Sequence, residues 1–370
     1  MQNLRIPGPT PCPPETLAEL SRQMINHRGP EFAALQGRIM ERLKRFFRTQ
    51  NEVYVLTSSG TSAMEAAIVN TLSPGDHVLA VTIGEFGDRF ASIAEAYGAQ
   101  VRRLEFEPGT AAEPAAIAAA LREDPAIKAV LVTHNETSTG VTNDMDAIGK
   151  AIRAVSPEIL YLVDAISSLG CISFSTDAWG VDVATTCSQK GFMIPPGLAF
   201  ITLSPRAWAA YETAKMPRFY LDIGQYRDYA KRGQPPWTPA VSLYYGLDHA
   251  LGMIEAEGFE QVHARHHAIA EYTRTKVKAL GLKLLARGNE ASDTVTSVLV
   301  PEGVSAGQLL ALLNTEFDTV LASGQGKLTG KIVRIGHMGI VDEADIDAAV
   351  ESLGVALERQ GYKRPAASNA

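Results

Sequence analysis

Seven short apolar runs, separated by stretches long enough for helices, constrain the fold of this 370-residue chain more than any other feature. The runs do not alternate between apolar and polar residues, which is typical of strands that are buried on both faces. Parallel strands need crossover connections, which are usually helices, so the pattern predicts an α/β fold with a roughly seven-stranded, mostly parallel sheet. The predicted strands are residues 53–56, 77–81, 101–106, 129–133, 160–163, 182–186 and 198–203.

The pattern changes after Pro239. A long helical stretch from 241 to about 280 carries one apolar stripe, and we place a domain boundary inside it. Three further strands, at 295–300, 319–322 and 332–335, alternate with helices and predict a smaller C-terminal α/β domain. At the other end of the chain, five prolines between Pro7 and Pro14 exclude a helix. We therefore expect an extended N-terminal arm (1–14), a large domain (15–258), a small C-terminal domain (259–362) and a disordered tail (363–370).

The composition limits the partners that the chain is expected to have. It contains 34 Lys and Arg against 41 Asp and Glu, and the basic residues are dispersed, so we expect no nucleic-acid partner. Three scattered cysteines are typical of a reducing compartment rather than of a disulfide scaffold. The N-terminus lacks a signal-peptide pattern, and no stretch reaches the roughly 18 apolar residues of a membrane span. We expect a cytoplasmic protein with no membrane partner.

Two charged residues at the ends of predicted strands are candidates for catalysis. Lys190 follows the strand at 182–186 in a turn-rich segment, where a partly desolvated amine could form a Schiff base, although a surface lysine is the alternative. Asp164 ends the strand at 160–163, and ligands of parallel sheets lie beyond such carboxyl ends. A carboxylate there suits a protonated pyridine nitrogen. The alternative is that Asp164 only caps a helix.

The segment 57–67, which contains Ser59-Gly60-Thr61, directly follows the first strand and opens a helix. Free amides and the dipole at a helix start favour an anion such as phosphate, and the glycine allows close approach of the backbone. Small polar residues also cap helices without any ligand, so both interpretations stay open.

Arg334 is a charged residue within the otherwise apolar strand predicted at 332–335. A buried arginine needs an anionic partner, and a substrate carboxylate is a natural bidentate one. By contrast, His263, His266 and His267 lack the carboxylate of a metalloprotease helix, so we expect an exposed helix face and no metal site. Nucleotide binding is disfavoured because no G-x-G-x-x-G follows the first strand and the segment 326–331 misses the phosphate-loop spacing.

In sequence order, these motifs together resemble the pyridoxal-phosphate site of fold type I enzymes, and specifically that of the class V aminotransferases in the alanine:glyoxylate and serine:glyoxylate (serine:pyruvate) group. The resemblance covers most of the chain, from Gly8-Pro9-Thr10 to the run 334–339. It rests on Ser59-Gly60-Thr61, Phe86, the run 133–141 with Thr137, Asp164, Gln189-Lys190, Thr238 and Arg334.

The resemblance implies pyridoxal 5′-phosphate as cofactor and a role for each matching residue. Lys190 would link to the cofactor and move a proton, while Asp164 would hold the ring nitrogen. The other expected contacts are Phe86 and Ile166 on the two ring faces, Thr137 at the phenolic oxygen, Ser59, Gly60, Thr61 and Gln189 at the phosphate, and Arg334 with Gly8 at the substrate. Thr238 would reach the phosphate of a neighbouring subunit, which implies a homodimer with shared active sites; the tyrosine that often lies three residues earlier is Pro235 here.

The activity implied is ping-pong transamination between a small L-amino acid, alanine or serine, and glyoxylate or pyruvate. No second arginine is evident for a side-chain carboxylate, which favours small donors. Alternatives within the family are aspartate:glyoxylate or aminophosphonate:pyruvate transamination. A lyase or desulfurase would need a cysteine on the loop near Arg334, and 322–331 contains none. A non-catalytic α/β protein would be expected to lack Lys190 or Asp164, and both are present.

Overall fold

A seven-stranded sheet forms the centre of the larger part of the computed structural model, which describes residues 2–364. The strand order is β2-β10-β9-β8-β5-β3-β4, and β10 alone runs antiparallel to its neighbours β2 and β9. The predicted α/β fold with a mostly parallel sheet is confirmed, and each of the seven apolar runs forms a strand. These are β2 (Val53–Ser58), β3 (His77–Thr82), β4 (Gln100–Glu105), β5 (Ile127–Thr133), β8 (Leu160–Asp164), β9 (Val183–Cys187) and β10 (Gly197–Leu203).

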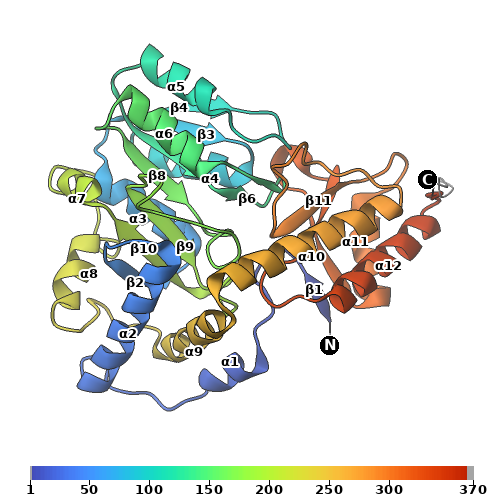
Figure 1. Cartoon of the computed structure of the whole chain (residues 1–370), viewed down its shortest axis with the longest axis horizontal. Helices are drawn as coiled ribbons and strands as arrows, with labels where there is room; N and C mark the ends of the chain where they lie inside the picture. Colours follow the sequence, from blue (N-terminus) through green and yellow to red (C-terminus); the bar gives the residue numbers. More distant parts are fainter. Residues whose placement is uncertain (1, 365–370) are drawn as a thin grey trace.

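Helices cover both faces of this sheet (Figure 1). Alternate side chains of one strand therefore enter different cores: Val53 and Val55 of β2 pack into one, and Tyr54 and Leu56 into the other. The first core is shared with α2 (Pro30–Phe47), α5 (Pro114–Glu123), α6 (Met145–Val155) and α9 (Val241–Glu257), and the second with α3 (Gly60–Thr71), α4 (Glu85–Ala96), α7 (Pro205–Tyr211) and α8 (Ile223–Ala230). Burial on both faces explains why the strand interiors are apolar and why polar groups gather beyond the strand ends.

A second sheet has four strands in the order β1-β12-β13-β11 and packs against α10, α11 and α12 (Figure 1). Its first strand comes from the N-terminal arm: β1 (Asn3–Arg5) pairs in parallel with β12 (Thr319–Ser323). The start of the predicted extended arm thus forms a strand of the small sheet. The other elements are β11 (Val295–Leu299), β13 (Ile332–Gly336), α10 (Phe259–Ala279), α11 (Ala306–Phe317) and α12 (Glu343–Arg359).

The helical stretch predicted from 241 to about 280 is two helices. Gly258 separates α9 from α10 and has φ 93°, a left-handed conformation that favours glycine. Helix α9 packs in the core of the large sheet, whereas α10 contributes Ile269 and Val277 to the core of the small one. We propose that the domain boundary lies here, between residues 258 and 259.

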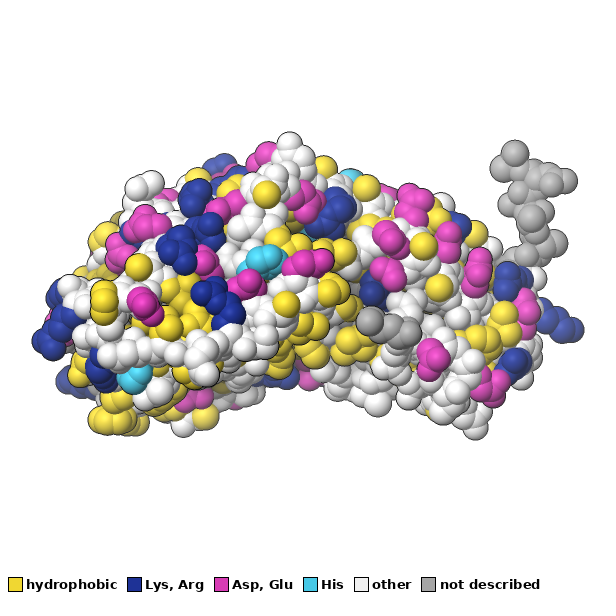
Figure 2. Space-filling model, turned by 90° about the horizontal axis from the view of Figure 1, so that it is seen from below, with side chains coloured by type: hydrophobic (Ala, Val, Ile, Leu, Met, Phe, Trp, Pro, Cys, Tyr) yellow, Lys and Arg dark blue, Asp and Glu magenta, His cyan; other side chains and the backbone are white. Residues whose placement is uncertain are grey.

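Short elements complete the chain: α1 (Pro14–Glu19), the hairpin β6 (Asn135–Glu136) and β7 (Val141–Thr142), and a 3₁₀ turn η1 (Gly326–Leu328). Within residues 2–364, every helix is too short or too polar to cross a membrane. On the face drawn in Figure 2, Lys and Arg side chains are interspersed with Asp and Glu. Of the tail predicted at 363–370, only Lys363 and Arg364 lie within the described residues.

Candidate active site

Lys190 lies in the turn after β9 and is partly buried, so it is not a freely exposed surface lysine. Its ammonium nitrogen donates a hydrogen bond to the carbonyl of Pro7 in the N-terminal arm. Gly8 has φ 107°, a left-handed conformation that favours glycine, and a Cβ atom there would lie 2.6 Å from Lys190 Nζ. Burial lowers the pKa of Lys190, which raises the fraction of neutral amine near physiological pH. The arm thus covers a lysine whose protonation state suits a nucleophile or a base.

The arm is fixed on both sides of Lys190. A side chain on Gly336 at the end of β13 would collide with the carbonyl of Ile6, so the arm lies directly against the small sheet. Farther along, the amide of Thr10 donates to the carbonyl of Gln189 at 3.2 Å. These contacts bring Gly8 and Gln189, two predicted site residues, next to Lys190.

Asp164 is the last residue of β8 and is 3% exposed. Its Oδ1 accepts a hydrogen bond from the Ile166 amide at 2.8 Å, and Thr133 Oγ1 lies 3.4 Å from Oδ2. A turn follows rather than a helix, so the helix-cap alternative is wrong. Burial raises the pKa of Asp164 to about 7, because no nearby hydrogen bond fully replaces the lost water. A cation at this carboxylate would restore its ionised form, and a protonated pyridine nitrogen fits that requirement.

The predicted phosphate cradle lies at the start of α3, beside the same strand ends. Ser59 occupies the N-cap position with extended backbone, and its hydroxyl makes no capping hydrogen bond within residues 2–364. A Cβ on Gly60 would lie 2.8 Å from Ile166 Cδ1 and 3.3 Å from Cys187 Cβ. The glycine therefore lets the helix start pack against Ile166 in the turn after β8. Uncapped amides at a helix N-terminus are suited to an anion, so these residues fit a phosphate group.

Phe86 and Thr137 are held near each other by a buried carboxylate that the sequence did not reveal as a site residue. Glu136 Oε2 accepts from the amides of Phe86 at 3.0 Å and Gly87 at 3.1 Å, at the start of α4. Its Oε1 accepts from the amide of Ser138 at 3.0 Å and from the Ser138 hydroxyl at 2.6 Å. Burial raises the pKa of Glu136, while these hydrogen bonds oppose that shift. Glu136 thus fixes the position of α4 relative to the segment that carries Thr137.

Arg334 lies in β13 of the small sheet and points toward the large one. Its Nη1 donates to the Thr137 carbonyl at 2.9 Å and its Nε to the Ser323 carbonyl at 2.8 Å. Burial lowers the pKa of Arg334 to about 10, and the charge of Glu136 opposes this shift. In the described part of the chain Arg334 forms no ion pair. The remaining guanidinium N–H groups are available to a substrate carboxylate.

Thr238 is the one predicted site residue that the single chain leaves apart. It is exposed and makes no hydrogen bond to Ser59, Gly60, Thr61 or Gln189 within residues 2–364. Its segment is anchored beside β2, where the Ala240 amide donates to Thr57 Oγ1 at 3.1 Å.

The histidine cluster on α10 differs from its prediction. His266 is 1% exposed: its Nδ1 donates to the Val262 carbonyl at 2.7 Å, and its Nε2 accepts from the Gly339 amide at 3.0 Å. The expected exposed helix face is therefore wrong for His266, because the segment at Gly339 lies against its ring, whereas His267 is exposed. Among residues 2–364, no group of three or more potential metal ligands is present.

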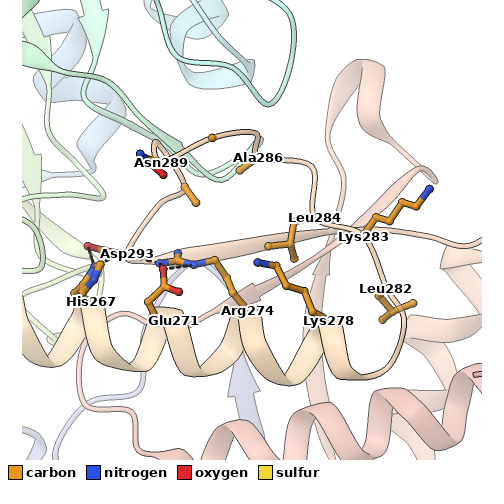
Figure 3. Close-up of a pocket in the computed structure, with 12 residues that line it drawn as sticks. His267, Glu271, Arg274, Lys278, Leu282, Lys283, Leu284, Ala286, Asn289 and Asp293 are labelled. Atoms are coloured by element: carbon orange, nitrogen blue, oxygen red, sulfur yellow. Dashed lines mark hydrogen bonds and ion pairs between the residues drawn. The ribbon is translucent and has the colours of Figure 1, made fainter. Parts of the chain in front are cut away.

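A surface pocket lies between α10 and the loop at 282–293, and His267 is one of the residues that line it (Figure 3). Arg274 points between Glu271 and Asp293 there, and His267 contacts Asp293. None of the predicted site residues lines this pocket.

A lysine beside a strand end, a buried carboxylate on the adjacent strand and an anion cradle at a helix start define a pyridoxal-phosphate enzyme of the α/β class. The chain belongs to the class V aminotransferase family, whose model, described as "Aminotransferase class-V", matches residues 8–348. The cofactor of this family is pyridoxal phosphate, and the residues present fit it.

Relatives of the chain are similar over nearly its whole length. It is 46% identical over 362 residues to a protein named soluble hydrogenase, small subunit, from Synechococcus, covering 97% of this chain and 94% of that protein. It is 42% identical to the L-aspartate–glyoxylate aminotransferase of Paracoccus denitrificans (92% and 87% covered) and 38% identical to the serine–glyoxylate aminotransferase of Methylorubrum extorquens (98% and 92%). The solved structure of alanine–glyoxylate aminotransferase from Nostoc superposes with a TM-score of 0.93 at 32% identity, covering 96% of this chain and 95% of the other.

Proposed function

We propose that this aminotransferase moves the amino group of a small L-amino acid, alanine or serine, to glyoxylate or pyruvate in a ping-pong reaction. The observation that carries the proposal is the convergence of Lys190, Asp164, the start of α3 and Arg334 where the large sheet meets the small one. The names of the serine– and alanine–glyoxylate relatives support the same substrate class.

Residues from several segments of the chain are proposed to hold the cofactor. Asp164 holds the ring nitrogen, Phe86 and Ile166 lie on the ring faces, and Thr137 donates to the phenolic oxygen. The phosphate is held by Ser59, Gly60, Thr61 and Gln189. Bound in this way, pyridoxal phosphate supplies an electron-withdrawing ring for the bonds at the substrate Cα.

Lys190 is proposed to be both the covalent anchor of the cofactor and the base that moves the Cα proton. Its lowered pKa supports this role, because a neutral amine is needed both to form a carbon–nitrogen bond and to accept a proton at Nζ. The Pro7 carbonyl, which accepts from Nζ, holds the amine in place and shields it from water.

Arg334 is proposed to bind the α-carboxylate that every amino acid and 2-oxo acid carries, with Gly8 leaving room beside it. This contact fixes the substrate without selecting among side chains. The preference for small donors rests on the site residues predicted from the sequence, among which no second arginine is evident for a side-chain carboxylate. The aspartate–glyoxylate relative makes aspartate the competing donor to test.

A homodimer is proposed because Thr238 is expected to complete the neighbouring subunit's phosphate site. Its segment carries an exposed aromatic cluster, in which Trp237 lies 5.1 Å from Phe219 and 5.9 Å from Tyr220 between ring centroids. Phe219 is 77% exposed, which is unusual for a side chain of this size. A second copy that covers this cluster would also bring Thr238 to a partner site. We further propose a cytoplasmic location, since Cys12, Cys171 and Cys187 are all unpaired.

A donor panel tests the proposal. Alanine, serine, aspartate, glutamate and an aminophosphonate are each offered with glyoxylate or pyruvate, and the new amino acid is quantified. Alanine or serine with glyoxylate is expected to give the highest kcat/KM. Preferred use of aspartate or of the aminophosphonate would overturn the proposed substrate but not the family.

A further inference from the structure

Arg89 on α4 is a cationic side chain beside the cofactor site that neither the motifs nor the proposed function uses. It lies one helical turn after Phe86, and its guanidinium carbon is 4.7 Å from the centroid of the Phe86 ring. Its Nη1 lies 3.5 Å from Thr61 Oγ1 at the start of α3. One side chain therefore contacts two walls of the candidate site, the ring-stacking wall and the phosphate cradle.

The acidic residues near Arg89 do not neutralise it. Asp88 and Glu95 on the same helix both pair with Arg103, at 3.0 and 2.8 Å. Glu85, four residues before Arg89, forms no ion pair with it, and within residues 2–364 Arg89 has no carboxylate partner within 4.0 Å. The positive charge of Arg89 is therefore free to act on an anion near Thr61.

The contact with Thr61 determines what the threonine hydroxyl can do. A hydroxyl has one proton to donate and two lone pairs with which to accept. Because Arg89 is a donor only, Thr61 must accept from it, and its own proton stays available for an anion. The cradle residues Ser59, Gly60, Thr61 and Gln189 are all neutral, so Arg89 adds a full charge to the partial positive charge of the helix start.

We propose that Arg89 is a positioning residue for the cofactor phosphate: held over the Phe86 ring, its guanidinium orients the Thr61 hydroxyl toward the phosphate. The proposal rests on the proposed cofactor site. It predicts that Arg89 contributes to the binding of pyridoxal phosphate but very little to the binding of pyridoxal, which has the same ring and lacks the phosphate.

The test compares how the cofactor-free enzyme binds these two compounds, measured by absorbance titration and without any turnover assay. Arg89→Gln is expected to raise the Kd of pyridoxal phosphate roughly 10-fold, as the loss of a charge-assisted contact would, and to change the Kd of pyridoxal less than about twofold. Thr61→Val is expected to weaken the binding of pyridoxal phosphate similarly. The double variant should lose less affinity than the product of the two single losses, because part of the effect of Arg89 passes through Thr61. Arg89→Lys, which keeps the charge, should lose less than Arg89→Gln.

Arg359→Gln is the matched control, because this exposed arginine also lies over an aromatic ring, 5.2 Å from the centroid of Phe317, but on α12 of the small domain. It should bind both compounds like the wild type. Unchanged binding of pyridoxal phosphate by Arg89→Gln would overturn the role of Arg89, and so would an equal loss for pyridoxal. A wild-type protein that binds neither compound would instead overturn the cofactor site itself.

Discussion

Asp164→Asn should have opposite effects on the cofactor-free and the cofactor-bound protein. In the free protein, burial raises the pKa of Asp164 from 3.8 to about 7. A carboxyl whose pKa is higher in the folded state is easier to ionise after unfolding, so it destabilises the fold as the pH rises above its ordinary pKa. An asparagine can still accept from the Ile166 amide and carries no charge to desolvate.

The size of the effect follows from the two pKa values. At about 1.36 kcal/mol per pKa unit, the cost of the carboxylate grows from roughly 0.6 kcal/mol at pH 4 to roughly 4 kcal/mol at pH 8.5, where it levels off. The value of roughly 4 kcal/mol is a maximum, because any water that still reaches the carboxylate lowers the cost of its burial. Cofactor-free Asp164→Asn is therefore expected to be more stable than the wild type at pH 8.5, by about 2–4 kcal/mol, and nearly equal to it at pH 4.

Urea unfolding of both cofactor-free proteins at the two pH values measures this difference. Adding pyridoxal phosphate should then stabilise the wild type much more than Asp164→Asn, because only a carboxylate can pair with the protonated ring nitrogen. A wild type that is as stable as Asp164→Asn at pH 8.5 without cofactor would refute the assignment of Asp164 as a desolvated carboxylate awaiting a cation.

Three further predictions concern other parts of the site. Arg334→Lys should raise KM for every amino acid and 2-oxo acid alike, since a lysine cannot bind a carboxylate bidentately; steady-state kinetics that show selective loss of one substrate would mean that Arg334 binds a side chain. Glu136→Gln should lower stability by about 1–3 kcal/mol in urea unfolding, because an amide cannot accept from both the Phe86 and Ser138 sides, and wild-type stability would contradict that role. Thr238→Ala should weaken cofactor binding, and mixed dimers with Lys190→Ala subunits should recover one intact site per dimer; no recovery on mixing would argue against a shared site.

The large sheet could be predicted from the sequence because burial on both faces makes each strand a local run of apolar residues. Each of its strands is a continuous apolar run that can be recognised without knowing its neighbours. Strand β1 contains no such apolar run, since it is three residues long and is stabilised by pairing with β12, more than 300 residues away. The break at Gly258 was also missed, because the apolar stripe continues on either side of it.

In the candidate site too, residues beside predicted strands could be predicted, whereas residues defined by contacts distant in the sequence could not. Lys190, Asp164 and the α3 start could be proposed because each lies within a few residues of the end of a predicted strand. Glu136 was visible in a motif, but its hydrogen bonds to the Phe86 and Gly87 amides join segments about 50 residues apart, and no spacing in the sequence reveals them. His266 was misjudged for the same reason, because the segment at Gly339 that buries it comes from another part of the chain.

The central claim is that Lys190 carries pyridoxal phosphate and passes an amino group through it. The most direct measurement is the visible absorbance of the purified, cofactor-loaded protein as a single amino donor is added without an acceptor. The wild type is expected to be yellow, to lose its visible absorbance with alanine or serine, and to regain it when glyoxylate is added, whereas Lys190→Ala should show no such cycle. A colourless wild type that cannot be loaded with pyridoxal phosphate, or a yellow one whose spectrum no donor changes, would contradict the claim.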